Sequence, residues 1–149
     1  TGTPLEIRIV KKGRNVVETM CLAEEEGISG MVVWLEEMTQ KDVLAEYARA
    51  DVVFDQLGNA VIGMGGVDAM AGGRPVIANW RPEIMDRVFG APSPVCQAST
   101  PEEVCAQLHR LVPDRAERER VGLLSRRFAE EHFSSEHAAR MCLKRLEDG

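Results

Sequence analysis

Residues 51–79 read DVVFDQLGNAVIGMGGVDAMAGGRPVIAN, and this stretch decides the fold. It opens with the apolar run 52–54, which predicts a buried strand because short continuous runs are typical of parallel sheets covered on both faces. A glycine-rich loop follows, then a short helix over about 67–71, a Gly72-Gly73 stop and a second strand over 75–78. The stretch therefore predicts a βαβ unit with a glycine loop at the carboxyl end of its first strand.

The glycine loop is the first candidate binding site. In open parallel sheets, ligands bind outside the carboxyl ends of the strands. Glycines let backbone N–H groups approach an anion, and the N-terminus of the next helix adds about half a positive charge. We therefore expect a phosphate-bearing ligand at the backbone amides of Gly63, Met64 and Gly65. The alternative is that the glycines serve only the steric needs of a turn, since the loop contains neither G-x-G-x-x-G nor a P-loop motif.

The composition limits the classes of protein that fit. The 149 residues fit one domain, and the hydrophobic fraction of 44% is that of a folded protein. The net charge of -6 argues against a general nucleic-acid binder, which would carry excess Lys and Arg. No apolar run approaches the ~20 residues of a transmembrane helix, so we expect no such segment. Four scattered cysteines without a C-x-x-C pair favour free thiols in a reducing, cytoplasmic compartment over a zinc site or disulfide framework.

Strands and helices alternate along the rest of the chain. A first helix is expected over 16–26, with one face formed by Val17, Met20, Cys21 and Leu22. A capping box at 39–42 predicts the start of a second helix through Ala50, whose inner face consists of Val43, Leu44, Tyr47 and Ala48. Further strands are expected at 5–10, 31–35 and 95–98, and further helices from Thr100, over 115–132 and over 134–146. This order predicts an α/β fold with a Rossmann-like parallel sheet flanked by helices and a C-terminal helical tail.

Several of these segments resemble the C-terminal, donor-binding domain of retaining, family 4 type glycosyltransferases of the GT-B fold. Residues 68–77, Asp-Ala-Met-Ala-Gly-Gly-Arg-Pro-Val-Ile, are close to the family's Glu-Ala-Met-Ala-x-Gly-x-Pro-Val-Ile. Four further segments resemble parts of that family. Residues 5–13 resemble its strand with a glycine turn, 32–38 its base-contacting loop, 42–55 its Ala-Asp-Val-Val segment and 128–135 its tail. The resemblance covers nearly the whole chain and implies one half of a GT-B fold.

The resemblance implies that the ligand is a nucleotide-sugar such as a UDP- or GDP-sugar, with no cofactor and no metal. Asp68 stands where the family has the glutamate that binds the ribose, and its alternative role is that of a first-turn acid stabilising the helix N-terminus. The cations Arg14, Lys12 and Arg74 would add charge near the phosphates, or are simply solvated. The implied donor-binding residues are Gly63, Met64 and Gly65 for the diphosphate, Asp68 for the ribose, backbone groups of Glu36, Glu37 and Met38 for the base, and Arg14.

The chain also departs from the family's pattern. Ala60 stands where the family has a glutamate that touches the transferred sugar, and no catalytic residue is assigned. The family's phosphate-binding Arg and Lys precede the strand that corresponds to 5–10. We therefore expect a donor-binding domain that is truncated at its N-terminus and inactive alone. A parent chain would supply the acceptor-binding domain and any membrane association. Two alternatives stay open: a non-catalytic nucleotide- or phosphate-binding regulatory module, which Ala60 favours, and an interaction domain that uses the helical tail.

Overall fold

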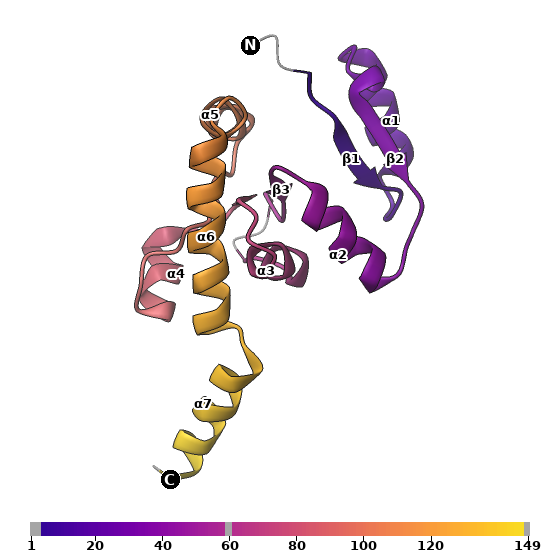
Figure 1. Ribbon diagram of the computed structural model, residues 1–149. Helices are drawn as coiled ribbons and strands as arrows, with labels where there is room; N and C mark the ends of the chain where they lie inside the picture. The colour runs from indigo at the N-terminus through magenta and orange to yellow at the C-terminus, as the bar shows by residue number, and fades with distance from the viewer. Residues whose placement is uncertain (1–3, 59–60, 148–149) are drawn as a thin grey trace. The chain divides into compact units, whose positions relative to one another are not determined.

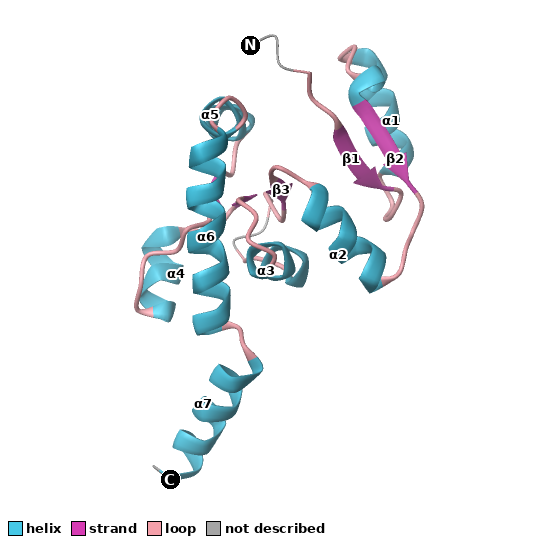
Figure 2. Cartoon of the chain, in the orientation of Figure 1, coloured by secondary structure: helices cyan, strands magenta, loops and turns pink. Residues whose placement is uncertain are grey.

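The computed structural model describes residues 4–58 and 61–147 (Figures 1 and 2). The chain divides into two compact units, Thr1–Val43 and Leu44–Gly149, and each is described by itself. Both contain parallel strands connected through helices. The α/β class with parallel sheets flanked by helices and a C-terminal helix, predicted from the sequence, is confirmed.

The first unit is a βαβ motif. Strand β1 (Ile7–Val10) pairs in parallel with β2 (Val32–Leu35), in a register that places Ile7 opposite Val32 and Val10 opposite Leu35. Helix α1 (Val16–Glu25) and the short 3-10 helix η1 (Ser29–Met31) connect the two strands. Gly27 follows α1 with a φ of 69°, a conformation that glycine adopts at little cost, and the helix ends within one residue of the predicted bound at 26.

Burial in the first unit is lower than the sequence predicts. Val17 is 73% exposed and Leu22 53% exposed, whereas Ala23 is the buried residue of α1. All four residues of β2 are half-buried. The physical reason is that one helix on two strands offers little apolar surface against which to bury a side chain.

The second unit has a sheet of three parallel strands in the order β3-β4-β5. Val53 lies opposite Val76, and Ile77 lies opposite Cys96. Helix α4 was not predicted, whereas β5 and the helices α5, α6 and α7 lie where the sequence places them. In chain order the elements are α2 (Gln40–Arg49), which spans the boundary between the units, β3 (Val53–Phe54), α3 (Met64–Ala71), β4 (Val76–Ala78), α4 (Pro82–Phe89), β5 (Cys96–Gln97), α5 (Pro101–Leu111), α6 (Arg115–His132) and α7 (Ser135–Glu147).

Strand β4 lies at the centre of the core and is fully buried. Its side chains alternate between two apolar clusters: Val76 and Ala78 belong to one, with Met70 and Phe128, and Ile77 belongs to the other, with Leu111 and Val121. The sheet is therefore covered on both faces, as expected for parallel strands. The predicted burial of the 52–54 run is only partly correct, because Phe54 is 45% exposed. On α2, Leu44 and Ala48 are also exposed. Tyr47 on α2 and Ala50, directly after the helix, pack on the core.

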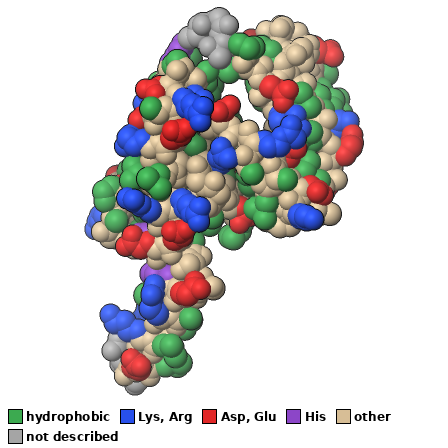
Figure 3. All heavy atoms as spheres, in the orientation of Figure 1, with side chains coloured by type: hydrophobic (Ala, Val, Ile, Leu, Met, Phe, Trp, Pro, Cys, Tyr) green, Lys and Arg blue, Asp and Glu red, His purple; other side chains and the backbone are tan. Residues whose placement is uncertain are grey.

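Helix α6 holds the second unit together. It packs against α3 (Figure 1), and Phe128 on α6 contacts the ring of Trp80, with 5.9 Å between the centroids. Its outer side carries ion pairs of mixed sign, such as Arg115–Glu119 and Arg126–Glu130. Figure 3 shows Lys and Arg interspersed with Asp and Glu on the face in view. Mixed charges of this kind are typical of a solvated helix face.

Candidate functional site

A polar cavity of about 470 Å³ lies at the carboxyl edge of the three-stranded sheet. Parallel strands end at the same edge, so the loops that follow β3, β4 and β5 meet there. The lining consists of Gly58, Asn79, Arg81, Pro82, Glu83, Gln97 and Ser99.

Gln97, at the end of β5, organises the cavity wall. Its side-chain Oε1 accepts hydrogen bonds from the backbone N–H groups of Trp80, at 2.6 Å, and Arg81, at 3.0 Å. Its Nε2 donates to Oδ1 of Asn79 at 3.2 Å, and its own carbonyl accepts from Nε2 of Gln107 at 3.1 Å. One amide side chain thereby fixes the loop after β4 to the end of β5.

Arg81 has an unusual backbone conformation at this wall. Its φ is 54°, in the left-handed region, and it is the one non-glycine residue with positive φ in the described part of the chain. Pro82 begins α4 directly after it and disfavours the right-handed helical region for the residue before it. Arg81 Nε lies 3.1 Å from Glu83 Oε1. The backbone N–H of Glu83 and, next, the side chain of Arg81 lower the pKa of the Glu83 carboxyl below its ordinary value, so the pair is ionised at neutral pH.

Helix α3 begins at Met64, with Gly63 as its N-cap residue, three residues earlier than the sequence predicts. Gly65 and Gly66 are thus helical and do not belong to the loop. At Gly66 a Cβ atom would lie 2.5 Å from Cγ1 of Ile62 and 2.7 Å from Oδ2 of Asp55. The steric role that we considered for these glycines is real at Gly66, because no larger residue fits there without displacing its neighbours.

The carboxylate of Asp55, directly after β3, binds at the N-terminus of this helix. Its Oδ2 accepts a short hydrogen bond from the backbone N–H of Gly63. Negative charge at a helix N-terminus is stabilising, since the first N–H groups have no acceptor within the helix. One of the three amides predicted to hold a phosphate is therefore already engaged, and within residues 4–58 and 61–147 no acceptor is seen for the amides of Met64 and Gly65.

Tyr47 and Asp68 lie close to the start of α3. The Tyr47 hydroxyl is so near that a Cβ on Gly65 would be 2.8 Å from it. Burial, followed by the negative charges of Asp55 and Asp68, raises the pKa of Tyr47, which keeps the phenol neutral. Asp68 is half-buried and is the fifth residue of α3. The alternative role of Asp68 as a first-turn acid is therefore wrong, because the helix begins earlier than predicted.

The other predicted donor-binding residues belong to the first unit. Glu36 and Glu37 follow β2 and pair with the end of β1, with Glu36 Oε1 2.5 Å from Lys11 Nζ and Glu37 Oε2 3.3 Å from Lys12 Nζ. Met38 is half-buried just after them. The carboxylates of Glu36 and Glu37 are thus engaged in ion pairs. The groups expected to contact a base are the backbone groups of residues 36–38.

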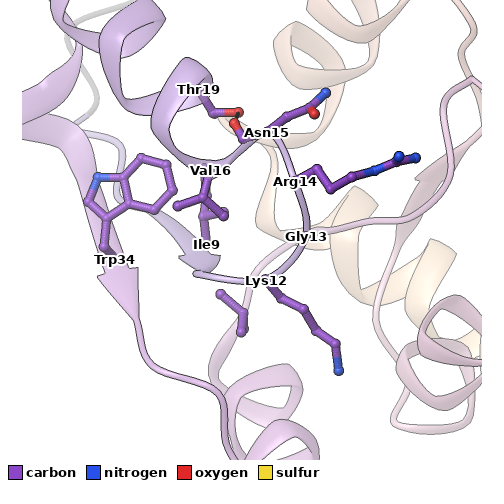
Figure 4. A pocket seen from close by; sticks show the side chains of 9 residues that line it. Ile9, Lys12, Gly13, Arg14, Asn15, Val16, Thr19 and Trp34 are labelled. Atoms are coloured by element: carbon purple, nitrogen blue, oxygen red, sulfur yellow. Dashed lines mark hydrogen bonds between the residues drawn. The ribbon is translucent and has the colours of Figure 1, made fainter.

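Arg14 lines a separate cavity of about 360 Å³ within the first unit (Figure 4). Lys12 and Gly13, whose φ is 99°, form the turn beside it, and Trp34 from β2 faces the cavity with Ile9 and Val16. Arg14 therefore shares its surroundings with Lys12. Gly63, Met64, Gly65 and Asp68 are brought together at α3 in the second unit, and Ala60 lies outside the described residues.

Sequence reasoning missed three contributors to the site in the second unit. They are Tyr47, which was expected to be a core residue, Asp55 and Gln97. For Asp55 a signal exists, since a carboxylate directly after a strand stands at the ligand-binding edge of a parallel sheet. For Gln97 no local signal exists, because its partners lie in another loop and depend on strand register.

A search with models of protein families and a search of curated proteins find no match for this sequence. In the described part of the chain, no helix combines the length and the apolar character that crossing a membrane requires. In the same residues, no three His, Cys, Asp or Glu side chains form a group that could hold a metal ion. Cys21, Cys96, Cys105 and Cys142 are free thiols, in line with the sequence prediction.

Proposed function

We propose that the chain is the donor-binding part of a retaining GT-B type glycosyltransferase and binds a nucleoside-diphosphate sugar. The observation that carries the proposal is the position of α3: a helix with glycine at its start, at the carboxyl edge of a parallel sheet. The resemblance of residues 68–77 to a glycosyltransferase motif falls on this same helix and the strand that follows it. The proposal thus has support from the residues and from their place in the fold.

In this proposal the diphosphate accepts hydrogen bonds from the amides of Met64 and Gly65, helped by the positive end of the helix. Asp68, farther along α3, binds the ribose hydroxyls. The resemblance implies base contacts for the backbone at 36–38 and added charge for Arg14, and these residues belong to the first unit, which is described by itself. Because Asp55 already engages the amide of Gly63, we expect this helix to bind a diphosphate through two amides and not three.

Transfer of the sugar would need an acceptor placed against the anomeric carbon and positive charge on the departing diphosphate. In the GT-B fold the acceptor lies on the other domain, so activity belongs to the parent chain. The role of this chain would be to hold the donor by its nucleotide and to orient the sugar. A non-catalytic nucleotide-binding module would show the same binding with no transfer by the parent.

The test is calorimetric titration of the chain with UDP, GDP, ADP and their sugar conjugates. We expect one nucleoside diphosphate to bind in preference to the others. Asp68→Ala should weaken that binding, and Glu130→Ala, which removes an exposed carboxylate on α6, should leave it unchanged. Absence of binding by every nucleotide, in this chain and in the parent chain, would refute the proposal.

A further inference from the structure

We propose that the Asp55 carboxylate determines the selectivity of α3 by its charge: it favours the sugar nucleotide over the free nucleoside diphosphate that remains after transfer. Asp55 follows β3 and accepts a hydrogen bond from the backbone N–H of Gly63, the N-cap residue of α3. The inference deepens the proposed function and rests on it, because it takes the diphosphate to bind at the start of this helix.

The carboxylate lies against the first turn of α3. A Cβ on Gly63 would be 3.2 Å from Oδ1 of Asp55 and 3.4 Å from Oδ2. A Cβ on Gly66, three residues further along, would be 2.7 Å from the same Oδ2. Residues three apart are neighbours on one face of a helix, so this oxygen lies close to both ends of the turn. Met64 and Gly65, whose amides are proposed to bind the diphosphate, belong to the same turn.

Tyr47 shows that the charge of Asp55 acts at this turn. The pKa of Tyr47 is raised by burial first, and then by the negative charges of Asp55 and Asp68. A Cβ on Gly65 would be 2.8 Å from the Tyr47 hydroxyl, so the affected group lies against the turn. Among residues 4–58 and 61–147, no Lys or Arg side chain forms an ion pair with Asp55.

This charge opposes the binding of a second anion to α3. The first N–H groups of a helix attract an anion, whereas a like charge within a few ångströms disfavours it. A diphosphate on the amides of Met64 and Gly65 would bind beside the carboxylate, within the screening length of about 8 Å at physiological ionic strength. The repulsion therefore grows with the charge of the phosphate that lies nearest.

The donor and the product of a transfer reaction differ in this charge. In a sugar nucleotide each of the two phosphates has one ionisable oxygen and one negative charge. A free nucleoside diphosphate ends in a phosphate that ionises a second time with a pKa of about 6, as a phosphomonoester does. Asp55 therefore repels the product more strongly than the donor, and we expect it to promote release of the diphosphate after the sugar has left.

The experiment is calorimetric titration at pH 8 of the unaltered chain and two variants. The probes are UDP, GDP and ADP, their glucose conjugates, and the uncharged nucleosides. Asp55→Asn removes the charge and keeps a side-chain oxygen that accepts from the Gly63 N–H, because Asn and Asp cap helices about equally well. Asp51→Asn is the matched control: it makes the same change at the other end of β3, where the side chain is 78% exposed.

We expect Asp55→Asn to tighten binding of the preferred nucleoside diphosphate by about tenfold and of its glucose conjugate by about threefold, because the nearest phosphate carries two charges in one and one in the other. Binding of the nucleosides should not change, and Asp51→Asn should alter none of these affinities. A thermal melt of each variant checks that it is folded. If Asp55→Asn does not fold, Asp55→Ser, which also caps without charge, should show the same differences.

The outcomes separate the inference from the proposed function. If the unaltered chain binds a sugar nucleotide but Asp55→Asn tightens neither ligand, or tightens both equally, the inference is overturned and the proposed function stands. A gain for the nucleosides as large as that for the diphosphates would also overturn it, since charge would not be the cause. If neither the chain nor a folded variant binds any nucleotide, the inference is overturned, and the proposed function then depends on the parent chain.

Discussion

The close contact between α3 and α6 leads to a sharp prediction for Gly122. Gly122 lies on α6, opposite the turn at Gly73 that ends α3. A Cβ at position 122 would stand 3.0 Å from the carbonyl carbon of Gly73 and still closer to its oxygen. These are backbone atoms in a turn with a φ of 72°, so no side chain can rotate away to make room. We therefore expect Gly122→Ala to force the two helices apart.

The magnitude follows from two opposing contributions. Replacing Gly by Ala in a helix interior is worth about 1 kcal/mol in favour of the variant. Overpacking a close contact costs about 1–3 kcal/mol. We expect the upper end here, because the obstacle is backbone and because Ala69 and Met70 on α3, the helix that would have to move, are fully buried. The free energy of unfolding should fall by about 2 kcal/mol, which in urea lowers the midpoint by about 1 M for a chain of this size.

Urea denaturation followed by Trp80 fluorescence measures this change. Trp80 is 1% exposed and packs on Phe89, with 5.4 Å between the centroids, so its emission reports on the second unit. A Trp34→Phe background removes the other tryptophan. Gly58→Ala is the matched control: nothing lies within 4 Å of its Cβ position, and we expect a change within about 0.5 kcal/mol. A midpoint for Gly122→Ala at or above that of the parent would refute the close contact.

Three further predictions concern single side chains. The Arg120 guanidinium is the main group that lowers the pKa of Glu117 from 4.5 to about 2, so its ion pair stabilises the fold above pH 4.5 and is lost as the pH falls toward 2. In urea titrations, the difference in the free energy of unfolding between the unaltered protein and Glu117→Gln should shrink as the pH falls over that range. A difference that does not depend on pH would contradict this. Tyr47, the single tyrosine, should ionise above its ordinary pKa of 10.0 in an ultraviolet titration, and Asp68→Asn should move the pKa back toward that value. An unchanged pKa in the variant would show that the charge of Asp68 does not act on Tyr47. Thr100→Ala removes the acceptor of the first turn of α5 and should cost about 1 kcal/mol in a thermal melt, whereas an unchanged melting temperature would show that the cap is not needed.

Local sequence signals were sufficient for most of the secondary structure. Thr100 caps α5 as the Thr-Pro-Glu-Glu motif predicts, with its side chain accepting from Glu103 N. Asp114 likewise accepts from Glu117 N at the start of α6. Each of these contacts joins residues three apart, so the information lies within one short stretch. The parallel arrangement of strands also follows from the alternation of strands and helices.

The errors have a common physical cause, which is the dominance of long-range contacts over local preference. Gly65 and Gly66 disfavour helix, yet they are helical because Asp55 caps α3 and the bulk of Tyr47 and Ile62 leaves no room for side chains. Helix α4 was missed because its start depends on a left-handed Arg81 held by Gln97, sixteen residues away. The sequence placed the candidate residues at the carboxyl edge of the sheet, but it did not predict the hydrogen bonds that shape the loops there.

The contact between α3 and α6 also constrains how the protein is made. Helix α3 has eight residues, too few to be stable by itself, and the core that covers it is completed by Phe128 and Ala129. A chain emerging from the ribosome therefore cannot stabilise its glycine loop when that loop appears. The contacts of α3 with β3 and β4 can form earlier, but its packing against α6 waits until α6 has left the exit tunnel, so the environment of α3 is completed late in the synthesis of the second unit.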